Sequence, residues 1–532
     1  MPTPSLVRWF PFLAWPRPTR ALLLGELSAG LTVGLMLVPQ GVAYAALAGM
    51  PLVTGIYASL LPALVAVLWS SSTRLGVGPT ALTSLLIGAS LTGLAQPGSA
   101  QWVALAAWMA ILSGGLQMVM GVARFGWIMQ VVTSPVLSGF TQAAALLILF
   151  SQLPALLGLH ESLFQWLQAP AMASVDGAAA AFGLGSLALL VVAKKRWPRF
   201  PAVVVIMGAA AALSGAIGYA AHGGAVVGAL PGGLPHFYWP GALDWGMFGE
   251  LTMPVLIVTL VSFLETASSA KVDHQKGGTR WDENQDLIAH GMAKISSGLC
   301  GAFATSASFS RSAINLYAGA RSGWATLFAT ALVLLALLWL TPALFHVPQS
   351  VLAAVVVAAI VNLIQPALAR QLWRLSRVEA VIGVATFALT LATAPRLYWG
   401  VLVGVLMNLT HFLYQRLHPR IIEVGLHPDG SLRDRHLWHL PALGPQVLAL
   451  RMDAELDFAS ARAIEQRLSV RQPLLFAIQL DPFVGRRGQR VELADLPGQA
   501  LTLAFERVAP PAGIGQRREP VTPGAPALCE RR

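Results

Sequence analysis

The sequence contains little charge and almost no cysteine. Charged residues make up 11% of the 532 residues and apolar residues 55%, whereas roughly a quarter of the residues in a soluble domain are charged. The mean hydropathy is +0.64. The two cysteines, Cys300 and Cys529, provide no disulfide framework, and neither they nor the histidines follow a metal-binding spacing. These features exclude a soluble globular protein and a disulfide-stapled one, and we expect neither a metal nor a cofactor.

Long apolar runs recur along most of the chain. Runs of about 20 residues are long enough to cross a ~30 Å hydrocarbon core as helices. They predict an all-α polytopic protein of the lipid bilayer, whose first run is a retained span and not a signal peptide. We predict fourteen spans, at 21–47, 52–70, 79–95, 101–122, 131–157, 178–193, 201–221, 247–270, 285–300, 309–320, 322–341, 347–364, 377–394 and 397–416.

The positive charge of the chain follows the loops. A net charge of +11 could indicate nucleic acid, but that interpretation requires the basic residues to share one exposed face. Lys and Arg instead recur at every second loop, including Arg8, Arg74, Arg124, Lys195, Lys271, Arg321 and Arg374. This positive-inside pattern predicts a multi-pass protein of the plasma or inner membrane with both termini in the cytoplasm, residues 1–20 being the cytosolic N-terminus.

Two of the predicted spans are too short to cross a bilayer alone. They are 79–95, after "RLGVGPT", and 309–320, after "GAFATSAS", and they are third in the first and in the second set of seven. Interrupted segments at matching places in two halves indicate a transporter built from inverted repeats, with its site near the midplane. We therefore expect a transmembrane domain at 21–416, with repeats at 21–221 and 247–416.

The sequence changes character after the last span. The segments "QVLALRMDAELDF" and "PLLFAIQL" are typical of strands and "ASARAIEQRL" of a short helix, which predicts a small cytosolic α/β domain at 417–484. From 485 to 532 the pattern dissolves into a Pro-rich tail. We expect this divergent tail to be disordered.

Arg311 stands in the serine-rich interruption "TSASFSRSAIN" between two apolar segments. A guanidinium at bilayer depth costs roughly 2.5–3.5 kcal/mol on insertion scales, so it is expected beside an anion or a water-filled cavity. The alternative is a side chain that snorkels to the interface from the end of a short helix.

Two long motifs resemble one transporter family. "GELSAGLTVGLMLVPQGVAYAALAGMPLVTGIYASLLPALVAVLWSSSTRLGVGP" and "NQDLIAHGMAKISSGLCGAFATSASFSRSAINLYAGAR" look like the SulP family of anion transporters, to which sulfate permeases, prestin and pendrin belong. The resemblance covers about residues 20 to 480. It implies seven plus seven inverted spans in a core and a gate domain, a cytoplasmic STAS domain, and a homodimer in which the core moves against the gate.

The same resemblance implies a substrate site. It carries over to Gln40 and Tyr44 on the first span, Thr80 before the third, and Ser310 and Arg311 at the start of the tenth. Two half-helices that begin close together present free backbone N–H groups to an anion. Arg311 adds a full charge, Ser310 and Gln40 can donate hydrogen bonds, and Phe309 and Tyr44 would shape the walls.

Several of these residues also have a structural explanation. Gln40 follows Pro39, so its amide could satisfy the backbone that a proline kink frees. Thr80 can bond its own helix, and Tyr44 can line a bundle without contacting a substrate.

Glu265, in "SFLETASSAK" on the eighth span, is the candidate for ion coupling. Burial disfavours the charged form of a carboxyl group, so Glu265 could be protonated at neutral pH and carry a proton with the anion. Ser269, one turn further on, would face the same way. Protons are the expected coupling ion and sodium is the alternative. A fixed contact that braces the core is the competing role for Glu265.

The chain also departs from the SulP pattern. The segment before the site lacks the usual Pro and Gly, and the triplet "AKI" replaces a more usual "ANI", so coupling or selectivity could differ. The turn that starts a helix after "FAIQLD" is absent, so the STAS-like region is degenerate or truncated.

The sequence therefore predicts secondary active transport of a small, sulfate-like anion, coupled to protons through an elevator-like movement. The alternatives are a passive channel or exchanger for bicarbonate, chloride or a dicarboxylate, and a nucleobase permease of the same fold. A neutral nucleobase has no need of Arg311. An enzyme is not expected, since no GxSxG, HExxH or phosphate-loop motif occurs.

Overall fold

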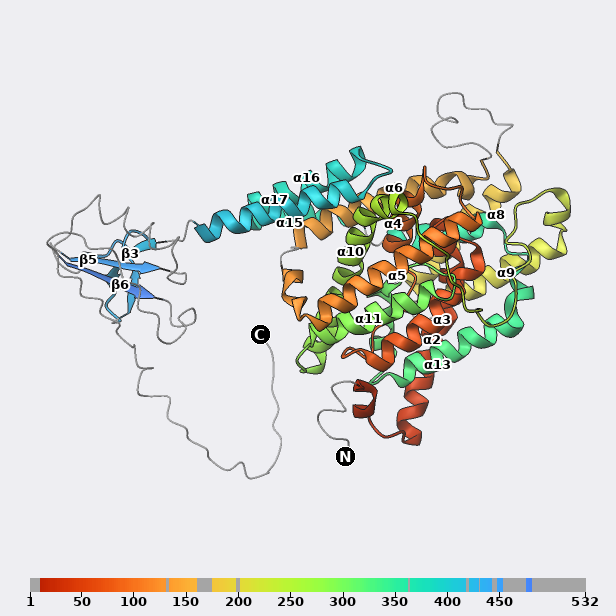
Figure 1. The fold of residues 1–532 in the computed structure, drawn as a ribbon, viewed down its shortest axis with the longest axis horizontal. Coiled ribbons are helices and arrows are strands. Elements are labelled where there is room, and N and C mark those ends of the chain that lie inside the picture. Colours follow the sequence, from red (N-terminus) through yellow and green to blue (C-terminus); the bar gives the residue numbers. More distant parts are fainter. Residues whose placement is uncertain are drawn as a thin grey trace. The chain divides into compact units, whose positions relative to one another are not determined.

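The computed structural model describes residues 10–130, 134–159, 175–197, 201–361, 364–417, 421–429, 431–442, 447–452 and 475–480. The chain divides into two compact units, Met1–Leu409 and Thr410–Arg532. Figure 1 shows that the first unit is helical and that the second contains a sheet.

Each of the fourteen predicted segments is mainly helical. Backbone polar groups find no partner in lipid, so a chain this apolar must satisfy them within helices. The helices of ten or more residues are α2 (Arg20–Leu47), α3 (Leu52–Trp69), α4 (Ala81–Leu91), α5 (Ala100–Val122), α6 (Ser134–Leu157), α8 (Gly177–Arg196), α9 (Ala202–Ala216), α10 (Trp245–Gly277), α11 (Glu283–Gly298), α13 (Trp324–Leu335), α14 (Gln349–Ile360), α15 (Pro366–Leu375), α16 (Arg377–Ala392) and α17 (Tyr398–Leu417). A shorter helix, α12, spans Phe309–Tyr317.

Seven of the helices in the described ranges are long and apolar enough to cross a membrane by themselves. They are Arg20–Leu47, Leu52–Trp69, Ala100–Val122, Pro135–Leu157, Gly177–Arg196, Trp245–Gln275 and Trp324–Leu344. They confirm the prediction of a helical, multi-pass membrane protein.

Two segments differ in detail from the prediction. The span at 322–341 is not one regular helix: α13 passes into a π-helical turn, η5 (Ala336–Leu340), and a 3₁₀ turn, η6 (Thr341–Leu344). Pro342, in the first turn of η6, has no backbone N–H to continue the helix. Helix α15 was not predicted; it begins with Pro366, a residue favoured at the first helical position.

Glycines bring helices into direct backbone contact. A Cβ on Gly55 of α3 would lie 1.9 Å from the carbonyl oxygen of Gly41 on α2, and one on Gly291 of α11 would lie 2.6 Å from that of Gly114 on α5. Small residues at such crossings allow the close approach typical of membrane helices. Helices α5, α11, α3, α2 and α13 accordingly pack side by side in that order (Figure 1).

The two short helices each follow a short strand. Strand β1 (Val77–Gly78) precedes α4 and strand β2 (Ser306–Ala307) precedes α12. The strands pair antiparallel, with Val77 opposite Ala307. The pairing holds the starts of α4 and α12 near each other, although more than 200 residues separate them in the sequence.

The second unit contains a four-stranded sheet in the order β4-β3-β5-β6. Its strands are β3 (Ile421–Leu426), β4 (Leu432–Asp434), β5 (Val447–Met452) and β6 (Leu475–Leu480). β3 pairs antiparallel with β4 and β5, and β5 pairs parallel with β6. Strands β5 and β6 coincide with the two predicted strands, whereas β3 and β4 were not predicted. The helix expected at "ASARAIEQRL" and the tail at 485–532 lie outside the described residues.

Candidate functional site

Two helix N-termini form the base of the candidate site. The Thr80 hydroxyl caps α4 by accepting a hydrogen bond from the backbone N–H of Thr83, and the Ser308 hydroxyl caps α12 by accepting one from that of Arg311. The remaining N–H groups of each first turn have no partner within the helix. Each terminus therefore carries a partial positive charge that favours an anion.

Arg311 lies in the first turn of α12 and is 1% exposed. Its Nη1 donates to Oε1 of Gln40 on α2 at 3.2 Å. Its Nε and Nη2 have no hydrogen-bond partner among the described residues. A buried guanidinium with two free donors is strongly unfavourable unless a further partner occupies the site.

Glycine lets the backbone of β1 approach Arg311. A Cβ on Gly76 would lie 2.6 Å from the Arg311 Cβ, closer than side chains tolerate. Ser312 completes the junction, because its hydroxyl accepts a hydrogen bond from the Gly76 N–H at 3.0 Å. These contacts fix the start of α12, and with it Arg311, against the segment that leads into β1.

Glu265 on α10 reaches the start of α4. The Thr80 hydroxyl donates to Glu265 Oε2 at 2.9 Å, and Glu265 interacts electrostatically with Arg311. The carboxyl group is therefore part of the same cluster as Arg311, Gln40 and Thr80. A proton gained or lost by Glu265 changes the charge beside the two helix N-termini.

The other predicted site residues take different places. Tyr44 is 7% exposed and near enough to Arg311 and Glu265 to interact electrostatically with both. Phe309 is 57% exposed and Ser310 is also exposed, so they lie on the open side of α12. The Ser269 hydroxyl donates to the backbone carbonyl of Glu265 within α10 and not to its carboxyl group.

A lysine near the site was not among the predicted site residues. Lys294 of α11 is 0% exposed, and its Nζ donates to the hydroxyls of Ser113 on α5, at 3.1 Å, and Ser262 on α10. The sequence marked it only as part of the "AKI" triplet, which departs from the "ANI" of the SulP pattern.

A second buried network joins the end of α3 to the start of α11. Asp286 is fully buried and accepts hydrogen bonds from the hydroxyls of Ser70 and Ser72 and from the Trp281 ring N–H, at 2.6–2.7 Å. These donors satisfy the carboxylate, so the network braces the loop that leads to β1.

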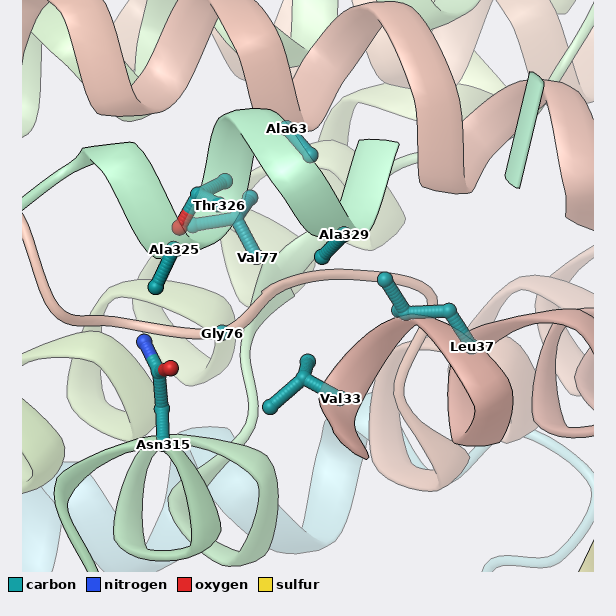
Figure 2. Close-up of a pocket in the computed structure, with 9 residues that line it drawn as sticks. All are labelled: Val33, Leu37, Ala63, Gly76, Val77, Asn315, Ala325, Thr326 and Ala329. Atoms are coloured by element: carbon teal, nitrogen blue, oxygen red, sulfur yellow. The ribbon is translucent and has the colours of Figure 1, made fainter. Parts of the chain in front are cut away.

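A small cavity lies beside the site but is not part of it. Its volume is about 10 Å³, and it is lined by Val33, Leu37, Ala63, Gly76, Val77, Asn315, Ala325, Thr326 and Ala329 (Figure 2). This space suits about one water molecule and no oxyanion. None of the predicted site residues lines it.

The fold and the site define a class of protein, a multi-pass helical membrane protein with a buried cation at the start of two short helices. Residues 23–386 match the Sulfate permease family. The chain belongs to this family, which is a family of transporters, and it is not an enzyme.

Relatives of known name match most of the chain. "Sulfate transporter 4.1, chloroplastic" of Arabidopsis thaliana is 32% identical over 485 residues, which cover 87% of this chain and 70% of the relative. "Sodium-independent sulfate anion transporter" of Bos taurus is 30% identical over 482 residues, covering 83% and 78%.

Solved structures share the fold. The murine Solute Carrier 26 family member A9 anion transporter aligns with a TM-score of 0.79 at 22% identity, over 90% of this chain and 84% of that chain. The transmembrane domain of the cyanobacterium bicarbonate transporter BicA aligns with a TM-score of 0.61 at 20% identity, over 74% and 98%.

Proposed function

We propose that this protein carries a small, sulfate-like anion across the membrane by secondary active transport, with protons as the coupling ion. One observation carries the proposal: Arg311 is buried at the start of α12, and two of its donor nitrogens have no partner among the residues that the structure describes. Gln40, Tyr44, Thr80, Phe309 and Ser310 complete the proposed substrate site.

Electrostatic energies support an anion at this position. At an effective dielectric near 20, a unit negative charge ~4 Å from the guanidinium gains on the order of 4 kcal/mol. That gain is about the size of the insertion cost of an arginine at bilayer depth. An oxyanion could also accept from the free N–H groups of α4 and α12, so the arginine and the anion stabilise each other.

The relatives support sulfate as the first anion to test. The plant and bovine relatives are both named as sulfate transporters, and both match more than four fifths of this chain. Their names support an oxyanion rather than a neutral nucleobase.

Glu265 is the proposed proton carrier. Its carboxyl oxygen accepts from Thr80, the cap of α4, and it interacts electrostatically with Arg311. Protonation of Glu265 removes a negative charge beside the anion, so the proton and the anion favour each other's binding. This reciprocity is what coupled transport requires.

The architecture we propose is fourteen spans in two inverted sets of seven, with both termini cytoplasmic. The matching positions of α4 and α12, and the pairing of β1 with β2, support this symmetry. We further propose an elevator-like movement, a homodimer, and a partial STAS-like domain at 417–484.

Uptake into proteoliposomes tests the proposal. An inward proton gradient should concentrate labelled sulfate in vesicles that contain the wild-type chain. Glu265→Gln keeps the shape but cannot titrate, so it should retain sulfate exchange and lose accumulation driven by the pH gradient. Replacing the proton gradient with a sodium gradient is the control for the coupling ion.

Two outcomes would contradict the proposal. Undiminished pH-driven accumulation by Glu265→Gln would return Glu265 to a bracing role. Facilitated sulfate flux without accumulation by the wild type would indicate a passive channel.

A further inference from the structure

Lys294 is a buried cation whose hydrogen-bond partners are all neutral. Its Nζ donates to Ser113 and Ser262. The other hydrogen bonds of these two hydroxyls join them to Thr259 and Gln117, which are also neutral. Among the described residues no ion pair includes Lys294. A buried ammonium without a direct counter-ion is costly, so its charge has to be balanced from further away.

Glu265 is the group that balances it. Glu265 stands one turn beyond Ser262 on α10, and it interacts electrostatically with Lys294 as well as with Arg311. Helix α5 carries no titratable side chain that could face Lys294. On α11 itself, His290 lies one turn before Lys294, and Asp286 lies one turn before His290. The carboxylate of Asp286 is already satisfied by its own hydrogen bonds.

The three charged groups form one connected arrangement. Ser262 links Lys294 to α10, and its backbone carbonyl accepts from Ser306 of β2 at 2.8 Å. Glu265 accepts from Thr80 at the start of α4. Lys294 is therefore joined, through Ser262 and Glu265, to the place where α4 and α12 begin, although it does not contact the anion site itself.

We propose that Lys294 is a selectivity-determining residue whose positive charge suits the site to a divalent oxyanion bound together with one proton. This inference rests on the proposed anion site and on Glu265 as the proton carrier. With Glu265 ionised, Arg311, Lys294 and Glu265 sum to one positive charge, which a monovalent anion neutralises. With Glu265 protonated they sum to two, which a dianion such as sulfate neutralises.

Removal of Lys294 should therefore change which anion is preferred. In Lys294→Met a thioether of similar length replaces the amine, and the fixed charge never exceeds one. Sulfate should then lose affinity relative to chloride by several-fold, since a positive charge attracts a dianion twice as strongly as a monoanion at the same distance. Lys294→Gln, which can still bond the two serines, should show the same change and serves if the Met variant does not fold.

The matched control is Ser113→Ala. It removes a hydrogen-bond partner of Lys294 but leaves the charge in place, so the ratio of sulfate to chloride affinity should stay as in the wild type. A purely structural role for Lys294 predicts something different, because disordered packing weakens the binding of both anions alike. The ratio of sulfate to chloride affinity therefore distinguishes an effect of the Lys294 charge from an effect of its packing.

Proton uptake tests the same inference on the unmodified protein. Calorimetric titrations of the purified full chain, in buffers of different ionisation enthalpy, report the protons taken up with each anion. We expect about one proton with sulfate and about none with chloride. Equal uptake with both anions, or an unchanged affinity ratio in both lysine variants, would overturn the role of Lys294 while leaving the Arg311 site intact. Proton uptake with sulfate that persists in Glu265→Gln would instead contradict the proposed carrier.

Discussion

At the scale of single residues, Arg311 is the test of the proposed site. Arg311→Ala should weaken sulfate binding by about 1.5–3 kcal/mol, the worth of a charge-assisted hydrogen bond, or on the order of ten- to a hundredfold in affinity. Arg311→Lys should recover part of the loss, since it restores the charge but not the planar fork that holds two oxygens. Titration of the detergent-purified proteins measures the three affinities.

Arg321 provides the matched control. It lies just beyond α12 and its side chain is exposed; within the described part of the chain, its only hydrogen bond is the one that its backbone N–H donates to Glu26. Arg321→Ala removes the same charge from the same segment and should leave sulfate affinity unchanged. Wild-type affinity in Arg311→Ala would show that Arg311 does not hold the anion.

Much of the candidate cluster could be predicted from the sequence. Arg311 interrupts an apolar run, and a charged group in such a run needs a partner, so the pattern marks it. Gln40 and Thr80 were assigned from the resemblance to the SulP family. Their mutual contacts could not be predicted, because the pairing of β1 with β2 joins segments more than 200 residues apart. Lys294 was marked only as a departure from the SulP pattern, because nothing in the sequence shows that two serines from other helices surround it.

At the scale of elements, the crossing of α2 and α3 should tolerate no added side chain. A methyl group on Gly55 would meet the Gly41 carbonyl at 1.9 Å, and overpacking of this kind costs about 1–3 kcal/mol. Gly55→Ala should therefore lower the thermal midpoint in detergent and weaken sulfate binding, because α2 carries Gln40. Gly25→Ala on α2 is the control, since a Cβ there meets nothing within 4 Å. Equal midpoints for the two variants would contradict the close crossing.

The sequence predicted helices better than it predicted their interruptions. Hydropathy marks every long apolar run, because lipid forces the backbone into helices. It does not mark the π-helical turn η5, where the residues remain apolar while the hydrogen bonds change register. Strand β4 was missed because it is three residues long, and strand β3 because it follows a long helix without a clear alternating pattern.

At the scale of the whole molecule, the proposed orientation depends on the basic loops. Ser99 and Gly224 lie in loops without Lys or Arg, which predicts that they face outside, but neither suits a labelling cysteine. The Ser99 hydroxyl caps α5 through the Trp102 N–H, and a side chain on Gly224 would meet the Tyr219 ring at 2.4 Å. Exposed neighbours in the same two loops avoid both problems.

Cysteines at Gln96 and Ala225, both exposed, should react with a membrane-impermeant thiol reagent added to intact cells, once Cys300 and Cys529 have been replaced. A cysteine at Lys195, exposed at the end of α8, should react only after the membrane is opened. The reason is that the loops carrying Lys and Arg stay in the cytoplasm, whereas the loops at Gln96 and Ala225 carry neither. Opposite sides for Lys195 and Ala225 also require α9 to cross the membrane, although it is too short to qualify by length alone. Reaction of Lys195→Cys and Ala225→Cys from the same side would remove a crossing from the first repeat and, with it, the proposed seven-span symmetry.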